Sequence, residues 1–212
     1  MANPFLVCVD PGHPSETSDG ATAHGLSENR LNWQVAQRLE AYLKANGVAY
    51  VLTKTHEKER VTNRQRAEVA NNARADLFMR LHCDTGSGRG YTWYYPDRAG
   101  TRQGVTGPSR DVCERSRTAA EILTKTMPLT LSGYLRANPV KTDAQTFVGG
   151  KQGGVLTGSI FARVPTALIE MCDLNAASDA RFIASPAGQD LMAQALLAGI
   201  VAYQDRVGAG GT

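Results

Sequence analysis

Residues 5–13 read FLVCVDPGH, an unbroken apolar run that stops at a turn and a histidine. A short apolar run without polar alternation is typical of a strand that is covered on both faces. A helical pattern follows at 29–45, where apolar residues recur at every fourth position from Leu31 to Leu43, after Ser27 as a candidate N-cap. A buried strand that leads into a helix predicts βαβ units around a mostly parallel sheet.

The same order continues along the chain. We expect strands at 48–53, at 77–81 ending at His82, at 91–95 and at 166–172, and helices at 64–74, at 110–127 and from Pro186, with Ser185 as the cap of the last. The segment 83–90 is predicted to be a loop and 96–108 a mobile one, whereas the glycine-rich stretch 149–158 has no clear pattern.

Length and composition limit the number of domains and the kinds of partner that the protein can have. A chain of 212 residues with 42% apolar and 20% charged residues predicts one globular domain, 1–207. A flexible tail is expected after it at 208–212. A net charge of +3 without a basic block argues against nucleic acid as a partner. The first apolar run is too short for a membrane span or a signal peptide, so any export signal is expected to be absent from this chain.

The cysteines show no metal-binding spacing. None of the four belongs to a C-x-x-C pair, and most lie inside apolar runs. A four-cysteine zinc site normally shows such short pairs, so buried free thiols are the better interpretation. The four are Cys8, Cys83, Cys113 and Cys172.

Two histidines directly follow predicted strands. His13 comes after the first strand and His82 after the strand at 77–81. Because the carboxyl ends of parallel strands meet at one edge of a sheet, where ligands bind, we expect the two side chains to lie close enough to share a metal. A hydrolytic zinc site takes three protein ligands and leaves a fourth position open. The sequence therefore predicts a third ligand nearby.

Two carboxylates compete to be that third ligand. Glu16 gives the H-x-x-E spacing of a zinc carboxypeptidase loop, whereas Glu28 stands at the start of the helix at 29–45. A helix start holds its side chains more rigidly than the Ser/Thr/Gly stretch around Glu16, which favours Glu28. His24 lies close to Glu28 in sequence and is a weak alternative ligand, and His56 is expected to be exposed.

An acid interrupts the last predicted strand. Glu170 stands among apolar residues of the segment 166–172, where an unpaired charge costs several kcal/mol to bury. Beside a divalent cation such a group can stay ionised, accept a proton from water and give it to a leaving amine. An ion pair with Arg80 is the structural alternative. Substrate-binding residues cannot be assigned from the pattern, although Trp93, Tyr94 and Tyr95 offer either core packing or a sugar-stacking platform.

Four blocks of this sequence, in order, resemble the zinc-dependent N-acetylmuramoyl-L-alanine amidases of the type-three amidase family. They are VDPGH at 9–13, GLSEN at 25–29, the residues AN, ADLF and LH within 70–82, and PTALIE at 165–170 with Asn175 after it. The resemblance implies a three-layer α/β/α hydrolase fold with a twisted six-stranded sheet. It also implies one Zn²⁺ ion held by His13, Glu28 and His82, with Glu170 as the catalytic base.

The implied reaction cleaves the amide between N-acetylmuramic acid and the L-alanine of the peptidoglycan stem peptide. Members of this family work in the periplasm or at the cell wall, or are phage lysins, and we expect a monomer whose partner is peptidoglycan. Two rival hypotheses stay open. One is a zinc carboxypeptidase-like amidohydrolase that uses Glu16, and the other is a catalytically inactive wall-binding module.

Overall fold

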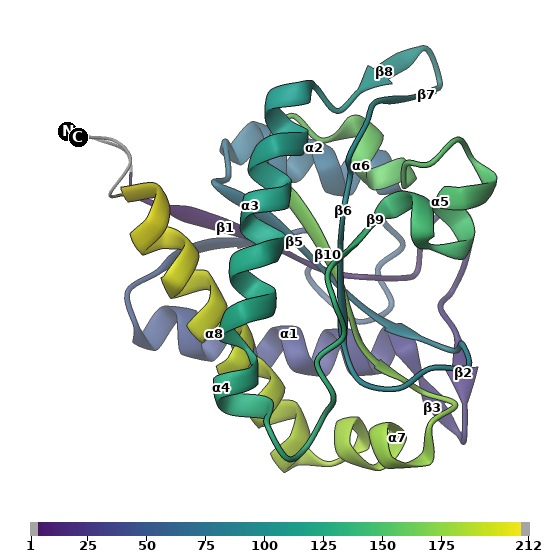
Figure 1. Ribbon diagram of the computed structural model, residues 1–212, viewed down its shortest axis with the longest axis vertical. Coiled ribbons are helices and arrows are strands. Elements are labelled where there is room, and N and C mark those ends of the chain that lie inside the picture. Colours follow the sequence, from purple (N-terminus) through teal and green to yellow (C-terminus); the bar gives the residue numbers. More distant parts are fainter. Residues whose placement is uncertain (1–3, 209–212) are drawn as a thin grey trace.

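Six strands form one sheet in the computed structural model, which describes residues 4–208 (Figure 1). The strand order is β4-β1-β5-β10-β6-β9, and β6 pairs antiparallel with β10 while the other neighbours pair parallel. The predicted mostly parallel six-stranded sheet is therefore confirmed. The strands are β1 (Leu6–Pro11), β4 (Ala49–Leu52), β5 (Leu77–Asp84), β6 (Thr92–Tyr95), β9 (Lys141–Thr142) and β10 (Thr166–Asp173).

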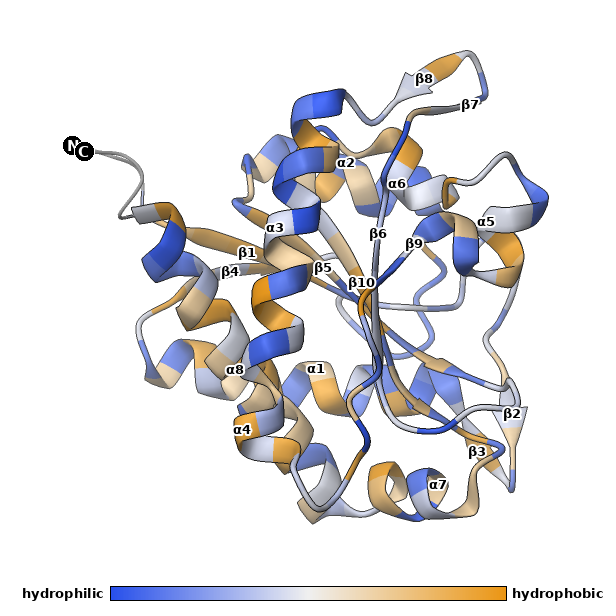
Figure 2. Cartoon of the chain, viewed as in Figure 1, coloured by the Kyte–Doolittle hydropathy of each residue, from blue (hydrophilic) through white to orange (hydrophobic). Residues whose placement is uncertain are grey.

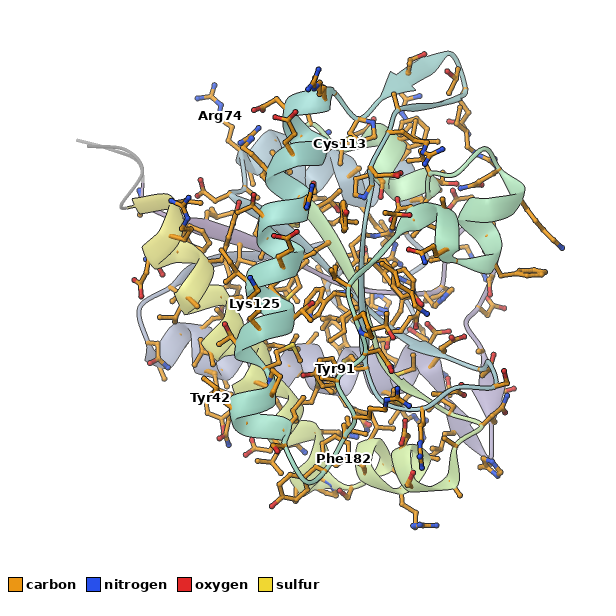
Figure 3. All side chains as sticks on the ribbon, in the orientation of Figure 1. Tyr42, Arg74, Tyr91, Cys113, Lys125 and Phe182 are labelled. Carbon is orange, nitrogen blue, oxygen red and sulfur yellow. The ribbon has the colours of Figure 1, made fainter. Side chains whose placement is uncertain are left out.

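The main core lies on one face of the sheet. Alternate residues of a strand point to opposite faces, and Val7, Met79 and Ile169, each fully buried, belong to this core. The helices α1 (Glu28–Ala45), α3 (Arg110–Thr126) and α8 (Pro186–Gly208) cover it. Side chains fill the space between these helices and the sheet, with the buried Tyr91 among them (Figure 3).

The opposite face carries a smaller core. Cys8 and Phe78 pack there against α2 (Asn63–Ala73) and α6 (Thr157–Phe161), which completes the three layers. The hydropathy colouring follows this division, since β1 is mostly hydrophobic whereas α3 alternates between hydrophobic and hydrophilic residues (Figure 2). Asp10 lies on β1 two residues after Cys8, and His82 lies on β5 four residues after Phe78, so both point to this second face. Glu170 of β10 is the register partner of His82 and points the same way. The strand register therefore places these polar side chains on one side of the sheet.

Shorter elements connect these layers. Two hairpins form, and the second projects beside α6 (Figure 1). The shorter elements are β2 (Thr22–Ala23), β3 (Leu26–Ser27), β7 (Gly100–Arg102), β8 (Val105–Gly107), α4 (Pro128–Leu131), the 3₁₀ turn η1 (Asp143–Gln145), α5 (Phe147–Lys151) and α7 (Ala177–Ala184).

Two predictions for the loops were wrong, and one stretch without a prediction turned out to be partly helical. The strand expected to end at His82 continues to Asp84, because Asp84 still finds a register partner in Asp173 of β10. Residues 96–108, expected to be a mobile loop, contain the β7–β8 hairpin. That hairpin packs on α6, where a Cβ at Gly107 would lie 2.5 Å from the carbonyl oxygen of Ile160. The unreadable stretch 149–158 contains the end of α5 and the start of α6.

The helix ends divide between confirmation and correction. Ser185 caps α8 as predicted, since its Oγ accepts a hydrogen bond of 2.9 Å from the amide of Gly188. Ser27 stands at the N-cap position of α1, but its side chain makes no capping hydrogen bond, and the helix begins at Glu28, one residue earlier than predicted. The Glu28 amide instead donates to Ala21 O at 3.0 Å. The predicted tail starts too early, because Gly208 ends α8. The remaining tail residues, 209–212, lie outside the described residues.

Two further expectations concern the chain as a whole. All four cysteines are buried and free, as the absence of paired spacings indicated. Among the residues that the structure describes, no helix is both long enough and apolar enough to cross a membrane.

Candidate active site

The structure brings His13, Glu28 and His82 together from three separated segments. His13 follows β1, Glu28 is the first residue of α1, and His82 lies near the carboxyl end of β5. Glu28 Oε1 lies 3.3 Å from His13 Nε2 and 2.9 Å from His82 Nδ1. One ligand atom from each residue lies within 4.8 Å of the others. These three side chains are therefore able to contact a single ion.

Backbone donors fix the Glu28 carboxylate. Oε2 accepts a hydrogen bond of 2.8 Å from the amide of Ala21, and Oε1 accepts one of 3.2 Å from the amide of Cys83. Burial acts to raise the pKa of Glu28, but the contacts with His13 and His82 outweigh it and hold this pKa well below its ordinary value. Glu28 is thus an ionised, oriented carboxylate at neutral pH.

Neither alternative ligand joins this cluster. Glu16 is exposed and accepts hydrogen bonds from the Asn63 amide at 2.8 Å and from Asn63 Nδ2 at 3.2 Å. His24 is exposed in the turn between β2 and β3, and His56 is exposed as predicted. The geometry therefore favours Glu28, as the comparison of a helix start with a loop indicated.

His82 has the environment of a metal ligand. Burial lowers the pKa of His82 to about 4, with Glu28 opposing the shift, so its ring is neutral at pH 7 and keeps a free lone pair. Its ring rests on the backbone of Gly12, where a Cβ would come within 2.4 Å of Cε1. Its Nε2 is buried without a hydrogen-bond partner. A side chain at position 12 would displace this ring.

The residues fit a zinc ion. Two ligand atoms that are each bound tetrahedrally at about 2.0–2.1 Å from zinc lie about 3.3 Å apart, close to the 3.3 Å and 2.9 Å that separate Glu28 Oε1 from the two histidine nitrogens. Two imidazoles and one carboxylate are also the donor set of several hydrolytic zinc sites. Nε2 of His82 has no hydrogen-bond partner, so this ring offers a nitrogen that no other group of the protein uses.

Glu170 faces this cluster from the neighbouring strand. It is the register partner of His82 across the β5–β10 pair, so both side chains stand on the same face of the sheet. Its Oε2 is buried and has no hydrogen-bond partner. Burial, followed by the nearby Glu28 and Asp84 carboxylates, raises the pKa of Glu170 well above its ordinary value. Glu170 is thus a buried carboxyl group that faces the three candidate ligands, with no hydrogen-bond partner for one of its oxygens.

The expected alternative, an ion pair between Glu170 and Arg80, is wrong. Arg80 Nε instead donates to Asp10 Oδ2 at 3.1 Å and its Nη2 donates to Asn63 Oδ1 at 2.7 Å. No ion pair joins Arg80 and Glu170 within residues 4–208. Glu170 is thus left without the structural partner that would explain its burial.

A cavity of about 410 Å³ opens over these groups. His13, Glu28, His82 and Glu170 all line it. Its rim includes Phe147 of α5, which is 76% exposed. Of the aromatic residues considered for sugar stacking, Trp93 is fully buried in the core, whereas Tyr94 lines the cavity; the expectation that at least one would pack in the core is confirmed.

Sequence reasoning missed the network that holds the His13 loop. Asp10 is fully buried, and its carboxylate lies 2.6 Å from Arg66 Nη1 and 3.1 Å from Arg80 Nε. Arg66 also donates to the carbonyls of Pro11 at 2.8 Å and Pro14 at 2.9 Å, on either side of His13. The signal available in the sequence was the acid directly after a buried strand.

A second buried cation holds the same loop. Lys54, which is almost fully buried, donates to the carbonyl oxygen of His13 and, at 2.9 Å, to Asn29 Oδ1. Burial and then the Arg66 charge lower the pKa of Lys54 to about 8. His13 is therefore positioned by the loop backbone on both sides and at its own carbonyl.

Comparison with known proteins places the chain in a family. Residues 7–202 match the family model described as N-acetylmuramoyl-L-alanine amidase. The chain belongs to this family. The chain is 28% identical over 213 residues to the N-acetylmuramoyl-L-alanine amidase LytC of Bacillus subtilis. The aligned region covers 96% of this chain but only 37% of LytC. It therefore spans little more than a third of the length of that relative.

Two other amidases match this chain along most of their own length. An N-acetylmuramoyl-L-alanine amidase of Mycobacterium tuberculosis is 25% identical over 222 residues, which is 94% of this chain and 86% of that protein. The crystal structure of an amidase of Mycobacterium smegmatis superposes with a TM-score of 0.78 at 19% identity, over 95% of this chain and 97% of the other. This superposition shows that the two chains share the α/β fold.

Proposed function

We propose that this amidase family member is a zinc-dependent hydrolase that cleaves the amide between N-acetylmuramic acid and L-alanine in peptidoglycan. The observation that carries the proposal is the convergence of His13, Glu28 and His82 opposite Glu170, an acid whose buried oxygen has no partner. The catalytic unit is the single domain expected at 1–207. It acts as a monomer with one zinc ion, in the periplasm or at the cell wall.

His13, Glu28 and His82 would hold the ion, each through one nitrogen or oxygen atom. Ala21 and Cys83 keep the Glu28 carboxylate oriented through their backbone amides. When bound, zinc acts as a Lewis acid that lowers the pKa of water and polarises a carbonyl group. Fixing these ligands in advance is what the loop network around His13 contributes.

Glu170 moves the proton. Its carboxylate accepts a proton from water as the water oxygen forms a bond to the lactyl carbonyl carbon. The bond from that carbon to the alanine nitrogen then breaks, and Glu170 returns the proton to the leaving amine. The raised pKa of Glu170 suits both steps, since a base that is too weak would accept no proton and an acid that is too weak would release none.

The rival hypotheses receive less support. A carboxypeptidase-like enzyme would need Glu16 at the ion, but that residue is exposed and bonded to Asn63. A binding module that had lost catalysis would have no need for Glu170, an acid that is costly to bury and has an oxygen without a hydrogen-bond partner. The site favours hydrolysis of the muramoyl amide.

Product analysis tests this proposal. Purified sacculi incubated with the zinc-loaded protein should release stem peptides that begin with L-alanine, detected by mass spectrometry, and leave muramic acid free of peptide. Chelation should stop the release and added zinc should restore it. Peptides shortened from their carboxyl end would support the carboxypeptidase alternative. Binding to the sacculi without any release would support the wall-binding module.

A further inference from the structure

A second cavity adjoins the first. Its volume is about 550 Å³, and it shares Asp84, Tyr94, Gln145 and Glu170 with the cavity over the candidate metal ligands. A ligand in the first cavity can therefore extend past Glu170 into the second without leaving the protein surface. The residues that line only the second cavity therefore determine which chemical group of a ligand can bind there.

Three cations belong to this second group. Arg89, Arg136 and Lys141 line the second cavity and not the first. Within residues 4–208 none of the three forms an ion pair, and Lys141 Nζ lies 6.0 Å from the centre of the Tyr94 ring. Their donors are thus available to a ligand.

The backbone around these cations is fixed. The segment from α4 to β9 runs along β6 (Figure 1), where Tyr91 bridges to Ala137 and Tyr94 is the register partner of Lys141. The amide of Tyr91 donates to Arg136 O at 2.9 Å, and a Cβ at Gly90 would lie 2.1 Å from the same oxygen. Glycine at position 90 therefore allows the chain carrying Arg136 to lie directly against the loop that carries Arg89.

The acid that lines only this cavity does not cancel the cations. Asp173 is buried, and its two oxygens accept hydrogen bonds from the amides of Gly88 at 2.8 Å and Asn175 at 2.9 Å. Asp84 and Glu170 lie at the boundary with the first cavity. The far part of the cavity thus offers three cations that no acid of the described residues pairs with, beside one buried carboxylate whose oxygens are held by backbone amides, and this arrangement favours an anionic ligand.

We infer that this second cavity binds the carboxylates of the stem peptide, with Arg89, Arg136 and Lys141 as their partners. The inference rests on the proposed function. In the proposed substrate the amino-sugar and the lactyl amide are uncharged, and carboxylates occur only on the peptide. The peptide therefore extends past Glu170 toward the cations, and the muramoyl group lies over the first cavity, whose rim includes the exposed apolar side chains of Phe147 and Val148.

Two matched probes test this inference. They are N-acetylmuramoyl-L-alanyl-D-glutamic acid and the same compound with both carboxylates converted to amides. The wild-type protein should hydrolyse the acid with a KM about ten-fold lower than that of the amide, as expected for charge-assisted contacts that are partly exposed. In the double variant Arg136→Gln/Lys141→Gln this ratio should fall toward one. Arg74→Gln is the control, because Arg74 projects into solvent from the end of α2 (Figure 3) and should keep the ratio.

Calorimetry separates this inference from the proposed function. The dipeptide L-alanyl-D-glutamic acid and its diamide can be titrated into the same three proteins, whether or not they hydrolyse the probes. Absence of hydrolysis by the wild type would count against the proposed function alone, and the binding ratio would still decide the inference. A double variant that keeps the wild-type preference for the acid, or a wild type without such a preference, would overturn it.

Discussion

Glu170→Gln should lower turnover of peptidoglycan at least 100-fold, a loss of the order expected when general acid–base catalysis is removed. Glutamine keeps the volume of the side chain and one of its two oxygens, but its amide cannot accept and return a proton. The variant should retain its zinc, because Glu170 is not among the three side chains that converge on one point. Turnover and zinc content, measured on the same preparation, check both statements.

The stability of this variant gives an independent readout. Because burial raises the folded pKa of Glu170 above its ordinary value of 4.5, its contribution favours folding at low pH and is lost as the pH rises through the folded pKa. At pH 7 the metal-free Glu170→Gln protein should therefore be at least as stable to heat as the metal-free wild type. Near-normal turnover would remove Glu170 from the mechanism, and a large loss of Tm would indicate a structural role instead.

Asp10→Asn should destabilise the fold by about 3–5 kcal/mol, the cost of breaking a buried ion pair by removing one partner. Asp10 is fully buried and pairs with both Arg66 and Arg80, so its loss leaves two guanidinium groups without their carboxylate. This is a large share of the roughly 5–15 kcal/mol that stabilises a typical domain. Urea unfolding at pH 7 measures the change.

An exposed ion pair on α2, the helix that carries Arg66, provides the control. Arg64 and Glu68 of α2 form an i,i+4 ion pair of 2.9 Å in which both side chains are about half exposed. Glu68→Gln should change the free energy of unfolding by less than about 0.5 kcal/mol. Equal effects of the two substitutions would show that the Asp10 network does not stabilise this fold as described.

The ion pairs of Asp10 also predict how stability depends on pH. Burial acts to raise the pKa of Asp10, but Arg66 and Arg80 outweigh it and lower this pKa below its ordinary value of 3.8. A lowered folded pKa means that the contribution of Asp10 is fully present above pH 3.8 and is lost as the pH falls below it. The stability gap between the wild type and Asp10→Asn should therefore narrow in acid.

Periodicity predicted most of the architecture because the sheet follows local rules. Apolar runs at 5–9, 77–81 and 166–172 each became a central strand, and the recurrence from Leu31 to Leu43 became α1. The two histidines were found because strand ends in a parallel sheet share an edge. What failed depended on distant contacts. The extension of β5 to Asp84 needs its partner Asp173, nearly ninety residues away in the chain.

The supporting residues of the site were less accessible for the same reason. Nothing local in the sequence says that Arg80 pairs with Asp10 rather than with Glu170, because both acids stand on the same face of neighbouring strands. The short helix α5 was missed because five residues with two glycines have no readable period. The cavity that gathers Arg89, Arg136 and Lys141 is formed by pairing across β6 and β9, which the sequence pattern did not predict.

Zinc content after exhaustive dialysis tests the central claim most directly, compared among the wild type, Glu28→Ala and Glu16→Ala, each first shown by circular dichroism to be folded. The geometry predicts about one zinc ion per chain in the wild type and in Glu16→Ala, and little or none in Glu28→Ala, because Glu28 Oε1 lies within reach of both histidines while Glu16 is bonded to Asn63. Retention of zinc by Glu28→Ala, together with its loss from Glu16→Ala, would contradict the assignment.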